Sequence, residues 1–406
     1  MDFSLTEDQR LIRDTVRQFM EAEVRPGVRQ RDHEEKFAAA ELRHLGSLGC
    51  CGMLIPEEWG GAALDTLSYV LMLEEVARID AAMAVALSVT NSVAAWPLYR
   101  HGTDAQRQHY LARLARGEML GAFCLTEPGA GSDSAAIATR AVRSGDTYLL
   151  NGSKSWVTNG GESGLYVVFA KTDPAAGARG ITAFLVEPGF RGFHVSRYED
   201  KMGLRTSRTA EITFNDCEVP AENRLGDEGQ GLKIALEALD GGRVGIAAQA
   251  LGIAQGALEA AVSYAQQRRA FGKTIGEFQA IAWMLADMHT ELEAGRALVW
   301  QAAWLRDTWL RETGSARLGT GASRAKLYAG EMVNRVVYKA VQIHGSMGYS
   351  RESDVERMYR DARVLSIYEG TSEIQRLIIA RDLLAHGAVP LTSSAQASQP
   401  ASEGSC

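Results

Sequence analysis

The chain has 406 residues, which is longer than one ordinary domain, so we expect two or three domains. Its composition, 46% hydrophobic and 23% charged, is typical of a globular protein with enough apolar side chains for a sizeable core. The formal net charge of -7 argues against nucleic acid and anionic membranes as partners of the whole surface.

Targeting and membrane signals are weak. The sequence has no run of 18 apolar residues, and its most apolar window, residues 81–96, is interrupted by polar residues: Ser88, Thr90, Asn91 and Ser92. The first ten residues carry acidic side chains and lack an apolar core segment, so we expect neither a signal nor a transit peptide. The expected location is therefore the cytoplasm.

The cysteine and histidine patterns predict neither disulfides nor a metal site. The 5 cysteines are an odd number and include no Cys-x-x-Cys pair, which is not typical of a disulfide framework or a zinc site. The 8 histidines are scattered, with no His-x-x-x-His spacing. We therefore expect reduced thiols and no metal.

Residues 1–118 are predicted to form a helical domain. Thr6 and Gln9 have the spacing of a capping box, and the residues that follow form one apolar face at helical spacing. Another amphipathic helix is expected over residues 67–79.

Residues 119–225 are predicted to form a small β-barrel or β-sandwich domain. β-Branched and aromatic runs occur at residues 147–150, 165–169, 181–186 and 210–214. Asn151-Gly152 and Asn159-Gly160-Gly161 are strong turn signals between such runs.

Residues 226–388 are predicted to form a helical bundle, with periodic segments at 231–268, 277–311, 318–345 and 372–386. Residues 389–406 are rich in Ser, Ala and Pro, which predicts a disordered tail. The expected fold class is thus multidomain α+β, in the order helical domain, β domain and helical bundle.

The segment around Glu369 is a candidate catalytic site. Gly370 allows a sharp bend beside this carboxylate, and Ser372 with Gln375 has the spacing of a capping box that starts a helix. A positioned general base fits this arrangement. A surface Glu that is favoured by the dipole of the following helix fits it as well.

Other candidate segments also allow two interpretations. Residues 123–133 form a glycine-rich loop after an expected strand, suited to oxygen ligands or to a plain hairpin, and no βαβ unit follows as in a dinucleotide fold. The Trp156 indole could cover one edge of a flavin, or it could pack in the core of a barrel. Arg243 could contact a ligand, or it could be an arginine near a helix start that is solvated or paired. Arg268 could bind a pyrophosphate or lie at a solvated basic helix end.

Taken together, these segments resemble the acyl-CoA dehydrogenases. Tyr-Glu-Gly-Thr-Ser-Glu-Ile-Gln at residues 368–375 is similar to the family's catalytic-base segment. Further family segments recur in the same order between about residues 3 and 385. They are Phe-Cys-Leu-Thr-Glu-Pro-Gly-Ala-Gly-Ser-Asp at 123–133, Asn-Gly-Ser-Lys-Ser-Trp-Val-Thr-Asn-Gly at 151–160, Leu-Asp-Gly-Gly-Arg-Val-Gly-Ile at 239–246, Gln-Arg-Arg-Ala-Phe-Gly-Lys at 267–273 and Gln-Ile-His-Gly-Ser-Met-Gly-Tyr at 342–349.

The resemblance implies a role for each matching residue. Glu369 is the implied catalytic base, and Gly242 stands where some members carry that carboxylate instead. The implied FAD contacts in the same subunit are Phe123, Leu125, Thr126, Gly131, Ser132, Trp156, Thr158, Thr371 and Glu373. The implied contacts to a neighbouring subunit's FAD are Arg268, Phe271, Gln279, Gln342, Ile343, Gly345 and Ser346. The implied substrate contacts are Ser132, Arg243, Tyr368 and Gly370.

The resemblance also implies the reaction. Glu369 removes the α-proton of an acyl-CoA thioester, a flavin accepts the β-hydrogen as hydride, and an electron-transfer flavoprotein takes the electrons from a homotetramer. The sequence of these segments is most similar to that of the short-chain and short-branched-chain members. Three alternatives stay open: an acyl-carrier-protein thioester dehydrogenase of secondary metabolism, a flavin oxidase or monooxygenase, and a flavin-bearing assembly partner without turnover.

Overall fold

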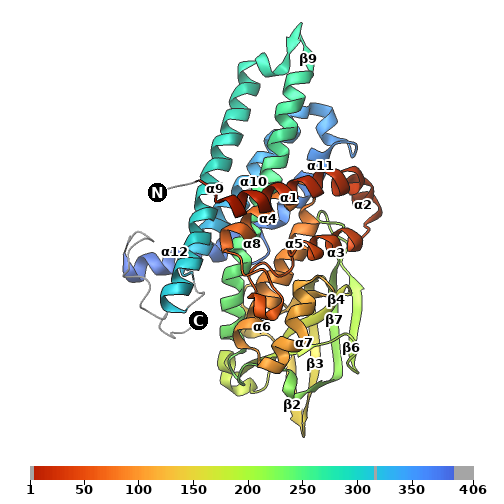
Figure 1. Cartoon of the computed structure of the whole chain (residues 1–406), viewed down its shortest axis with the longest axis vertical. Helices are drawn as coiled ribbons and strands as arrows, with labels where there is room; N and C mark the ends of the chain where they lie inside the picture. Colours follow the sequence, from red (N-terminus) through yellow and green to blue (C-terminus); the bar gives the residue numbers. More distant parts are fainter. Residues whose placement is uncertain (1–3, 315–317, 388–406) are drawn as a thin grey trace.

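The computed structural model describes residues 4–314 and 318–387, which form three successive parts (Figure 1). Helices come first, one β-sheet forms the middle, and a second set of helices completes the chain. The predicted fold class is therefore confirmed. The exact division at residues 118 and 225 stays a prediction, and the predicted tail at 389–406 lies outside the described residues.

The N-terminal helices begin where the sequence supplies capping side chains. α1 (Glu7–Phe19) has the predicted capping box, in which Thr6 Oγ1 accepts from the Gln9 backbone N–H. Asp65 caps α4 (Thr66–Ile79) by accepting from the Ser68 N–H at 2.6 Å. The other helical segments of this part are η1 (Met20–Val24), η2 (Arg25–Gly27), α2 (Val28–Glu34), α3 (Ala39–Ser47), η3 (Glu57–Trp59), α5 (Ala81–Ser88), η4 (Val89–Ala95), α6 (Trp96–His101) and α7 (Asp104–Ala115).

The middle part is built on a mixed sheet. Its strands are β1 (Leu120–Cys124), β2 (Arg140–Ser144), β3 (Thr147–Thr158), β4 (Ser163–Lys171), β5 (Ile181–Val186), β6 (Phe193–Tyr198), β7 (Thr209–Pro220) and β8 (Arg224–Leu225). The strand order is β6-β7-β3-β2-β4-β5-β8, and β1 pairs in parallel with β4. All four predicted strand runs lie in these strands, and apolar residues cover both faces of the sheet.

One predicted turn is wrong. Asn151 and Gly152 lie inside β3, where the pairing with β7 shifts register between Leu150 and Gly152. β7 carries the extra residue of this bulge, since Asn215 and Asp216 lie opposite Asn151 alone, and Gly152 has a φ of 145° there. A side chain at Gly152 would meet Thr139 Oγ1 at 2.5 Å. The predicted turn at Asn159–Gly161 is confirmed, because the residues directly after β3 form it.

The C-terminal part consists of long helices, of which four were predicted: α8 (Gly231–Gln267), α9 (Gln279–Thr313), α10 (Thr320–His344) and α12 (Ser372–His386). The sequence did not indicate α11 (Asp354–Ala362) or the hairpin of β9 (Arg269–Ala270) and β10 (Lys273–Thr274). Short helical turns connect these elements: η8 (Ile275–Glu277), η9 (Gly345–Tyr349) and η10 (Arg363–Ser366). The β9–β10 hairpin joins α8 to α9 at the end of the molecule opposite the sheet (Figure 1).

Two helical stretches, Ala81–His101 and Gly231–Gln267, are long and apolar enough to cross a membrane by length and composition. Their apolar windows are 100% and 83% buried inside the protein, respectively. Core packing accounts for this composition, since buried helices are hydrophobic around their whole circumference.

α8 is the element around which the helices pack, since it contacts α4, α9 and α10. Glycines on α8 permit a close approach to α4. A Cβ at Gly252 would lie 2.3 Å from the carbonyl oxygen of Glu74, and one at Gly256 would lie 2.4 Å from that of Arg78. Only residues without a side chain allow two helix backbones to come this close.

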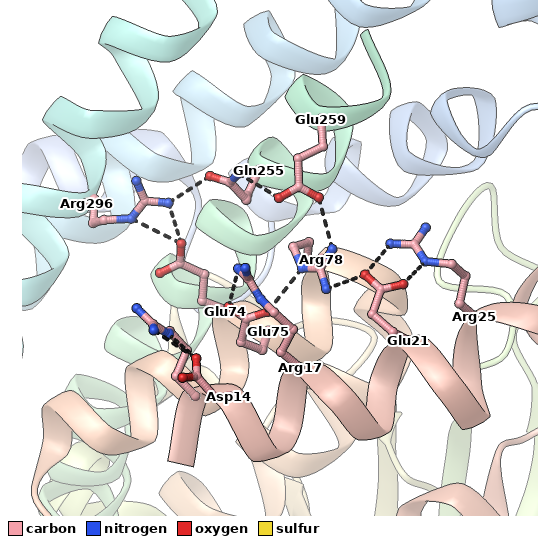
Figure 2. A network of polar contacts seen from close by, with 11 residues as sticks. Asp14, Arg17, Glu21, Arg25, Glu74, Glu75, Arg78, Gln255, Glu259 and Arg296 are labelled. Carbon is pink, nitrogen blue, oxygen red and sulfur yellow. Dashed lines mark hydrogen bonds and ion pairs between the residues drawn. The ribbon is translucent and has the colours of Figure 1, made fainter. Parts of the chain in front are cut away.

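A network of charged side chains joins α1, η1, α4, α8 and α9 (Figure 2). Its centre is Arg78, which is 3% exposed and contacts three carboxylates: Glu21 at 2.6 Å, Glu75 at 3.1 Å and Glu259 at 2.9 Å. At the edge of the network, Glu74 accepts from Arg296 Nε of α9 at 3.1 Å. A buried charge is tolerated only when it is paired, so these contacts fix the N-terminal helices against the C-terminal ones.

We expect Arg78→Met to lower the free energy of unfolding by about 1–3 kcal/mol, since it removes charge-assisted hydrogen bonds to three carboxylates, of which Glu75 is buried. The nearly buried Glu75 carboxylate would lose one of its two arginine partners and keep Arg17, which lies 2.8 Å away. Arg13→Met is the matched control, because its pair with Asp14 is exposed and such pairs contribute about 0–1 kcal/mol. Urea unfolding followed by circular dichroism measures both, and equal effects of the two substitutions would contradict the role given to the network.

Candidate functional site

Glu369 lies in a tight turn between η10 and α12. Its φ is 53° and that of Gly370 is 88°, so two successive residues adopt the left-handed region. This conformation is ordinary for glycine and uncommon for a residue with a side chain. Such backbone geometry persists where the surroundings hold it, and it occurs often at functional sites.

The predicted capping box of the following helix is wrong. Thr371, not Ser372, is the N-cap of α12, and its Oγ1 accepts from the Ile374 N–H at 3.3 Å. The Gln375 side chain instead donates to the carbonyl oxygens of Glu369 and Gly370, at 3.2 and 3.1 Å. The helix therefore starts one residue earlier than predicted, and Gln375 fastens the turn that carries Glu369.

The Glu369 carboxyl group is buried against α8. Its Oε2 is inaccessible to solvent and has no hydrogen-bond partner among the described residues. Burial raises the pKa of Glu369 from 4.5 to about 7, while Arg243 and Lys326 oppose that rise. A carboxyl group with this pKa exchanges protons near neutral pH, which suits a general base.

Gly242 makes room for this carboxyl group. A Cβ built at Gly242 would lie 2.7 Å from Glu369 Oε2 and 3.0 Å from its Cδ. Side chains at positions 242 and 369 would therefore occupy the same small volume, although the two residues belong to different elements. Only one of them can carry a side chain there, and in this chain it is Glu369.

Two cations lie near Glu369. Arg243 is buried, and its Nη1 donates to Asp240 Oδ1 at 2.7 Å. Lys326 of α10 is 1% exposed, and its Nζ donates to the carbonyl oxygen of Gly370 at 2.7 Å. Sequence reasoning missed Lys326, although a lysine on the apolar face of a helix, between Ala325 and Ala329, was a signal for it.

Tyr368, a predicted substrate contact, is held from α8. Its hydroxyl donates to the Gln249 side chain, and Gln249 Nε2 in turn donates to the carbonyl oxygen of Ala81 at 2.7 Å. The side chains that flank Glu369 are thus fixed by buried hydrogen bonds, which is how a reactive group is kept in one geometry. Arg243, Tyr368, Glu369 and Gly370 are brought together by the fold.

The glycine-rich loop lies beside the part of β3 that carries Trp156. The Ser155 N–H donates to the carbonyl oxygen of Thr126 at 2.9 Å. Lys154, which is fully buried, donates to the carbonyl oxygen of Leu125 at 3.1 Å and pairs with Glu127 at 2.7 Å. Loop and strand are therefore tied together by three contacts.

Trp156 is not part of a barrel core. It is 59% exposed and has a φ of 59°, at a point where the β3–β7 pairing shifts register between Lys154 and Val157. A bulge of this kind turns a side chain out of the sheet. Because Trp156 follows Ser155, whose N–H is bonded to Thr126, the flat ring of the indole forms an exposed apolar surface on the strand beside the loop.

The other predicted residues of this region surround the same surface. Thr126 and Thr158 are half-buried, Gly131 and Ser132 are exposed, Leu125 is buried, and Phe123 packs on Phe169 with ring centroids 4.9 Å apart. A Cβ built at Gly129 or Gly131 would meet no atom within 4 Å. The loop is therefore open to a ligand, and an exposed indole with neighbouring hydroxyls fits the flat, heteroatom-rich ring of a flavin.

The residues expected to contact a neighbouring subunit's cofactor lie elsewhere. Arg268 and Gln279 are exposed beside the β9–β10 hairpin, and Phe271 at its tip is 94% exposed. This hairpin is far from the sheet within one chain (Figure 1). At the end of α10, Gln342, Gly345 and Ser346 are exposed, whereas the Ile343 side chain belongs to the core.

Thr371 and Glu373 line an open cleft of about 440 Å³ on the outer face of α10, together with Arg335 and Arg363. The fold thus divides the predicted cofactor residues into separate groups on one chain.

Within residues 4–314 and 318–387, no group of three or more His, Cys, Asp or Glu side chains could hold a metal ion. Cys50, Cys51, Cys124 and Cys217 are buried free thiols, and burial raises the pKa of Cys51, Cys124 and Cys217 to about 12. These thiols are inert, and Cys406 lies outside the described residues.

Comparison with known proteins places this geometry in a family. The N-terminal, middle and C-terminal domains of acyl-CoA dehydrogenase match residues 6–118, 122–217 and 229–384, respectively. The short-chain specific acyl-CoA dehydrogenase of Clostridium acetobutylicum is 46% identical over 380 residues, which cover 94% of this chain and 99% of that protein.

Solved structures agree with the sequence comparison. Butyryl-CoA dehydrogenase from Megasphaera elsdenii has a TM-score of 0.91 at 46% identity, covering 95% of this chain and 100% of its own. A chain from a study of the electron transferring flavoprotein of Acidaminococcus fermentans has a TM-score of 0.92 at 48% identity, with coverage of 95% and 100%. An acyl-CoA dehydrogenase of Bacillus anthracis complexed with FAD has a TM-score of 0.88 at 33% identity, covering 94% of this chain and 68% of that one.

The family match spans nearly the whole chain, and the flat surface beside Trp156 fits the cofactor that the family uses, FAD. The chain is a member of the acyl-CoA dehydrogenase family.

Proposed function

We propose that this chain oxidises a short-chain acyl-CoA to its trans-2-enoyl thioester, with Glu369 as the base. The single observation that carries the proposal is the buried, unpartnered Glu369 carboxyl group beside Gly242 and two cations. The short chain is supported by the relatives, which include short-chain specific and butyryl-CoA dehydrogenases at 46% identity.

The mechanism uses residues whose positions follow from the fold. Glu369 removes one α-proton of the thioester and becomes a neutral carboxylic acid, a change that its buried surroundings favour. Bound FAD supplies the acceptor for the β-hydrogen, which leaves as hydride, so that the C–C bond becomes a double bond. Thr126, Ser132, Trp156 and Thr158 would hold the flavin ring, and the Glu369 N–H would polarise the thioester carbonyl.

We also propose that the enzyme is a homotetramer with shared cofactor sites. Phe271, Tyr349 and Leu384 are 94%, 87% and 89% exposed on a single chain, although all three are large and apolar. Arg268 and Gln279, beside the β9–β10 hairpin, would reach the FAD of another subunit. Apolar side chains that are this exposed are typical of a subunit interface.

Two further proposals concern the environment. Electrons would leave to an electron-transfer flavoprotein, as supported by the structural neighbour from that system. The protein would act in the cytoplasm, since the four cysteines within the described residues are free thiols, as expected in a reducing compartment.

Glu369→Gln is expected to lower the rate of flavin reduction by butyryl-CoA by at least about 10⁴-fold, because general-base catalysis contributes about 10²–10⁴-fold and no second carboxylate can replace it at Gly242. Glu369→Asp should lie between this variant and the wild type, since a shift of about 1 Å can cost ~10² in rate. Anaerobic stopped-flow absorbance measures both. A near wild-type rate in Glu369→Gln with full FAD content would exclude Glu369 as the base.

The rate of flavin reduction should rise with pH, with a midpoint near 7 in the free enzyme, because only the ionised Glu369 can accept a proton.

The stability of the folded protein should show the opposite trend with pH. A native pKa above the unfolded value of 4.5 means that ionisation disfavours the folded state, so stability falls as pH rises towards 7. Glu369→Gln should therefore raise the melting temperature at pH 8 more than at pH 5. An equal change at both pH values would contradict the raised pKa.

Phe271→Asp is expected to weaken subunit association and FAD retention together, because it places a charge on the apolar tip of the hairpin. Sedimentation velocity reports the assembly state, and flavin absorbance after gel filtration reports the bound cofactor. Val142→Asp is the matched control, since Val142 is a similarly exposed apolar residue on β2 and outside the predicted interface. Unchanged assembly with full FAD in Phe271→Asp would count against shared sites at this hairpin.

A further inference from the structure

Lys326 is a buried cation that the mechanism above does not use. It lies on the apolar face of α10, between Ala325 and Ala329, and is 1% exposed. Burying an ammonium group is unfavourable unless specific contacts compensate for the loss of water. The contact that the fold provides is the carbonyl oxygen of Gly370, which accepts from Lys326 Nζ at 2.7 Å.

This carbonyl belongs to the turn that presents Glu369. The left-handed backbone at Glu369, with a φ of 53°, is unfavourable for a residue with a side chain, so the turn needs support from its surroundings. Lys326 from α10 and Gln375 from α12 both donate to the Gly370 carbonyl, from two different helices. Together they fix the direction in which the Glu369 side chain leaves the backbone.

The charge of Lys326 also acts on Glu369. Arg243, the other nearby cation, forms an ion pair with Asp240 at 2.7 Å, which partly neutralises its effect. Lys326 has no carboxylate within ion-pair distance in the part of the chain that the structure describes, so its charge is not neutralised in this way. Burial lowers the pKa of Lys326 to about 8, and Glu369 is the strongest of the groups that raise it.

The charged and titratable groups around this pair come from several elements. Arg243 of α8 faces both Glu369 and Lys326. Tyr69 of α4 and the adjacent Tyr368 sense the charge of Glu369. Glu331 of α10 and Glu373 of α12 act on Lys326 from the solvent side. Among these groups, Lys326 alone combines a charge near Glu369 with a hydrogen bond to its turn.

We propose that Lys326 is a positioning residue for the dehydrogenation: it anchors the Gly370 carbonyl so that Glu369 stays directed at the Gly242 face, and its charge favours the ionised base. This inference rests on the proposed function, in which Glu369 removes the α-proton. Lys326 does not touch the substrate. It acts through the geometry and the ionisation of Glu369.

The test compares three substitutions in the FAD-loaded enzyme. Lys326→Met removes both charge and hydrogen bond, Lys326→Gln keeps an N–H donor without the charge, and Lys326→Arg keeps the charge. Flavin reduction by butyryl-CoA is measured against pH by anaerobic stopped-flow absorbance. Lys233→Met, at an exposed lysine of α8, is the control and should behave as wild type.

We expect the midpoint of the pH profile to move up by about one pH unit or more in Lys326→Met and Lys326→Gln, since a nearby opposite charge lowers a carboxyl pKa by roughly 1–3 units. Lys326→Arg should keep the wild-type midpoint. The plateau rate should fall by about 10–100-fold in Lys326→Met, through misplacement of the base, and less in Lys326→Gln. Lower rates with wild-type midpoints in all three variants would overturn the proposal.

A second measurement separates this inference from the proposed function. The carboxyl band of Glu369 is titrated by infrared difference spectroscopy of the substrate-free holoenzyme, with Glu369→Gln as the reference for subtraction. A higher midpoint in Lys326→Gln supports the role of Lys326 even if butyryl-CoA reduces no flavin, an outcome that would count against the proposed function alone. An unchanged midpoint overturns it. If Lys326→Met does not fold, Lys326→Gln and Lys326→Arg provide the same comparison.

Discussion

The burial of one carboxyl group is the constraint on which the site depends. Glu369 lies out of water against the backbone of α8, where its ionised form is disfavoured and its protonated form is favoured. A base in this state accepts a proton readily, but it needs cations nearby to be ionised at neutral pH. Arg243 and Lys326 supply that charge from two different helices, so the chemistry of the site depends on the packing of the bundle.

Small residues on α8 make this packing possible. Gly242 leaves the space that the Glu369 carboxyl group occupies, and Gly252 and Gly256 allow α4 to lie against α8. The network around Arg78 then ties the N-terminal helices to α8 and α9 (Figure 2). α8 therefore carries both the packing contacts of the bundle and the backbone against which Glu369 lies. We expect substitutions at either of these places on α8 to affect the other.

The proposed flavin-binding surface at Trp156 and the glycine-rich loop depends on a different structural feature. Here the sheet is interrupted, and a bulge in β3 turns Trp156 outward while the buried Lys154–Glu127 pair holds the loop alongside. A buried ion pair seldom adds much stability by comparison with apolar packing. We therefore infer that this pair serves mainly to fix the position of the loop against β3. The separation of this surface from the β9–β10 hairpin explains why a complete cofactor site, as we propose it, needs more than one chain.

The sequence alone determined the order of helical, β and helical parts, the four long helices of the bundle, the Thr6 capping box and the segment that carries Glu369, because these depend on local periodicity and on motifs of adjacent residues. The tertiary structure decided what depends on distant residues. Asn151-Gly152 became part of a strand because β7 continues alongside it, and Thr371 became the helix cap while Gln375 bonds to the Glu369 turn. Lys326 lies 43 positions before Glu369 in the sequence, and only the packing of α10 against that turn brings its ammonium group to the Gly370 carbonyl.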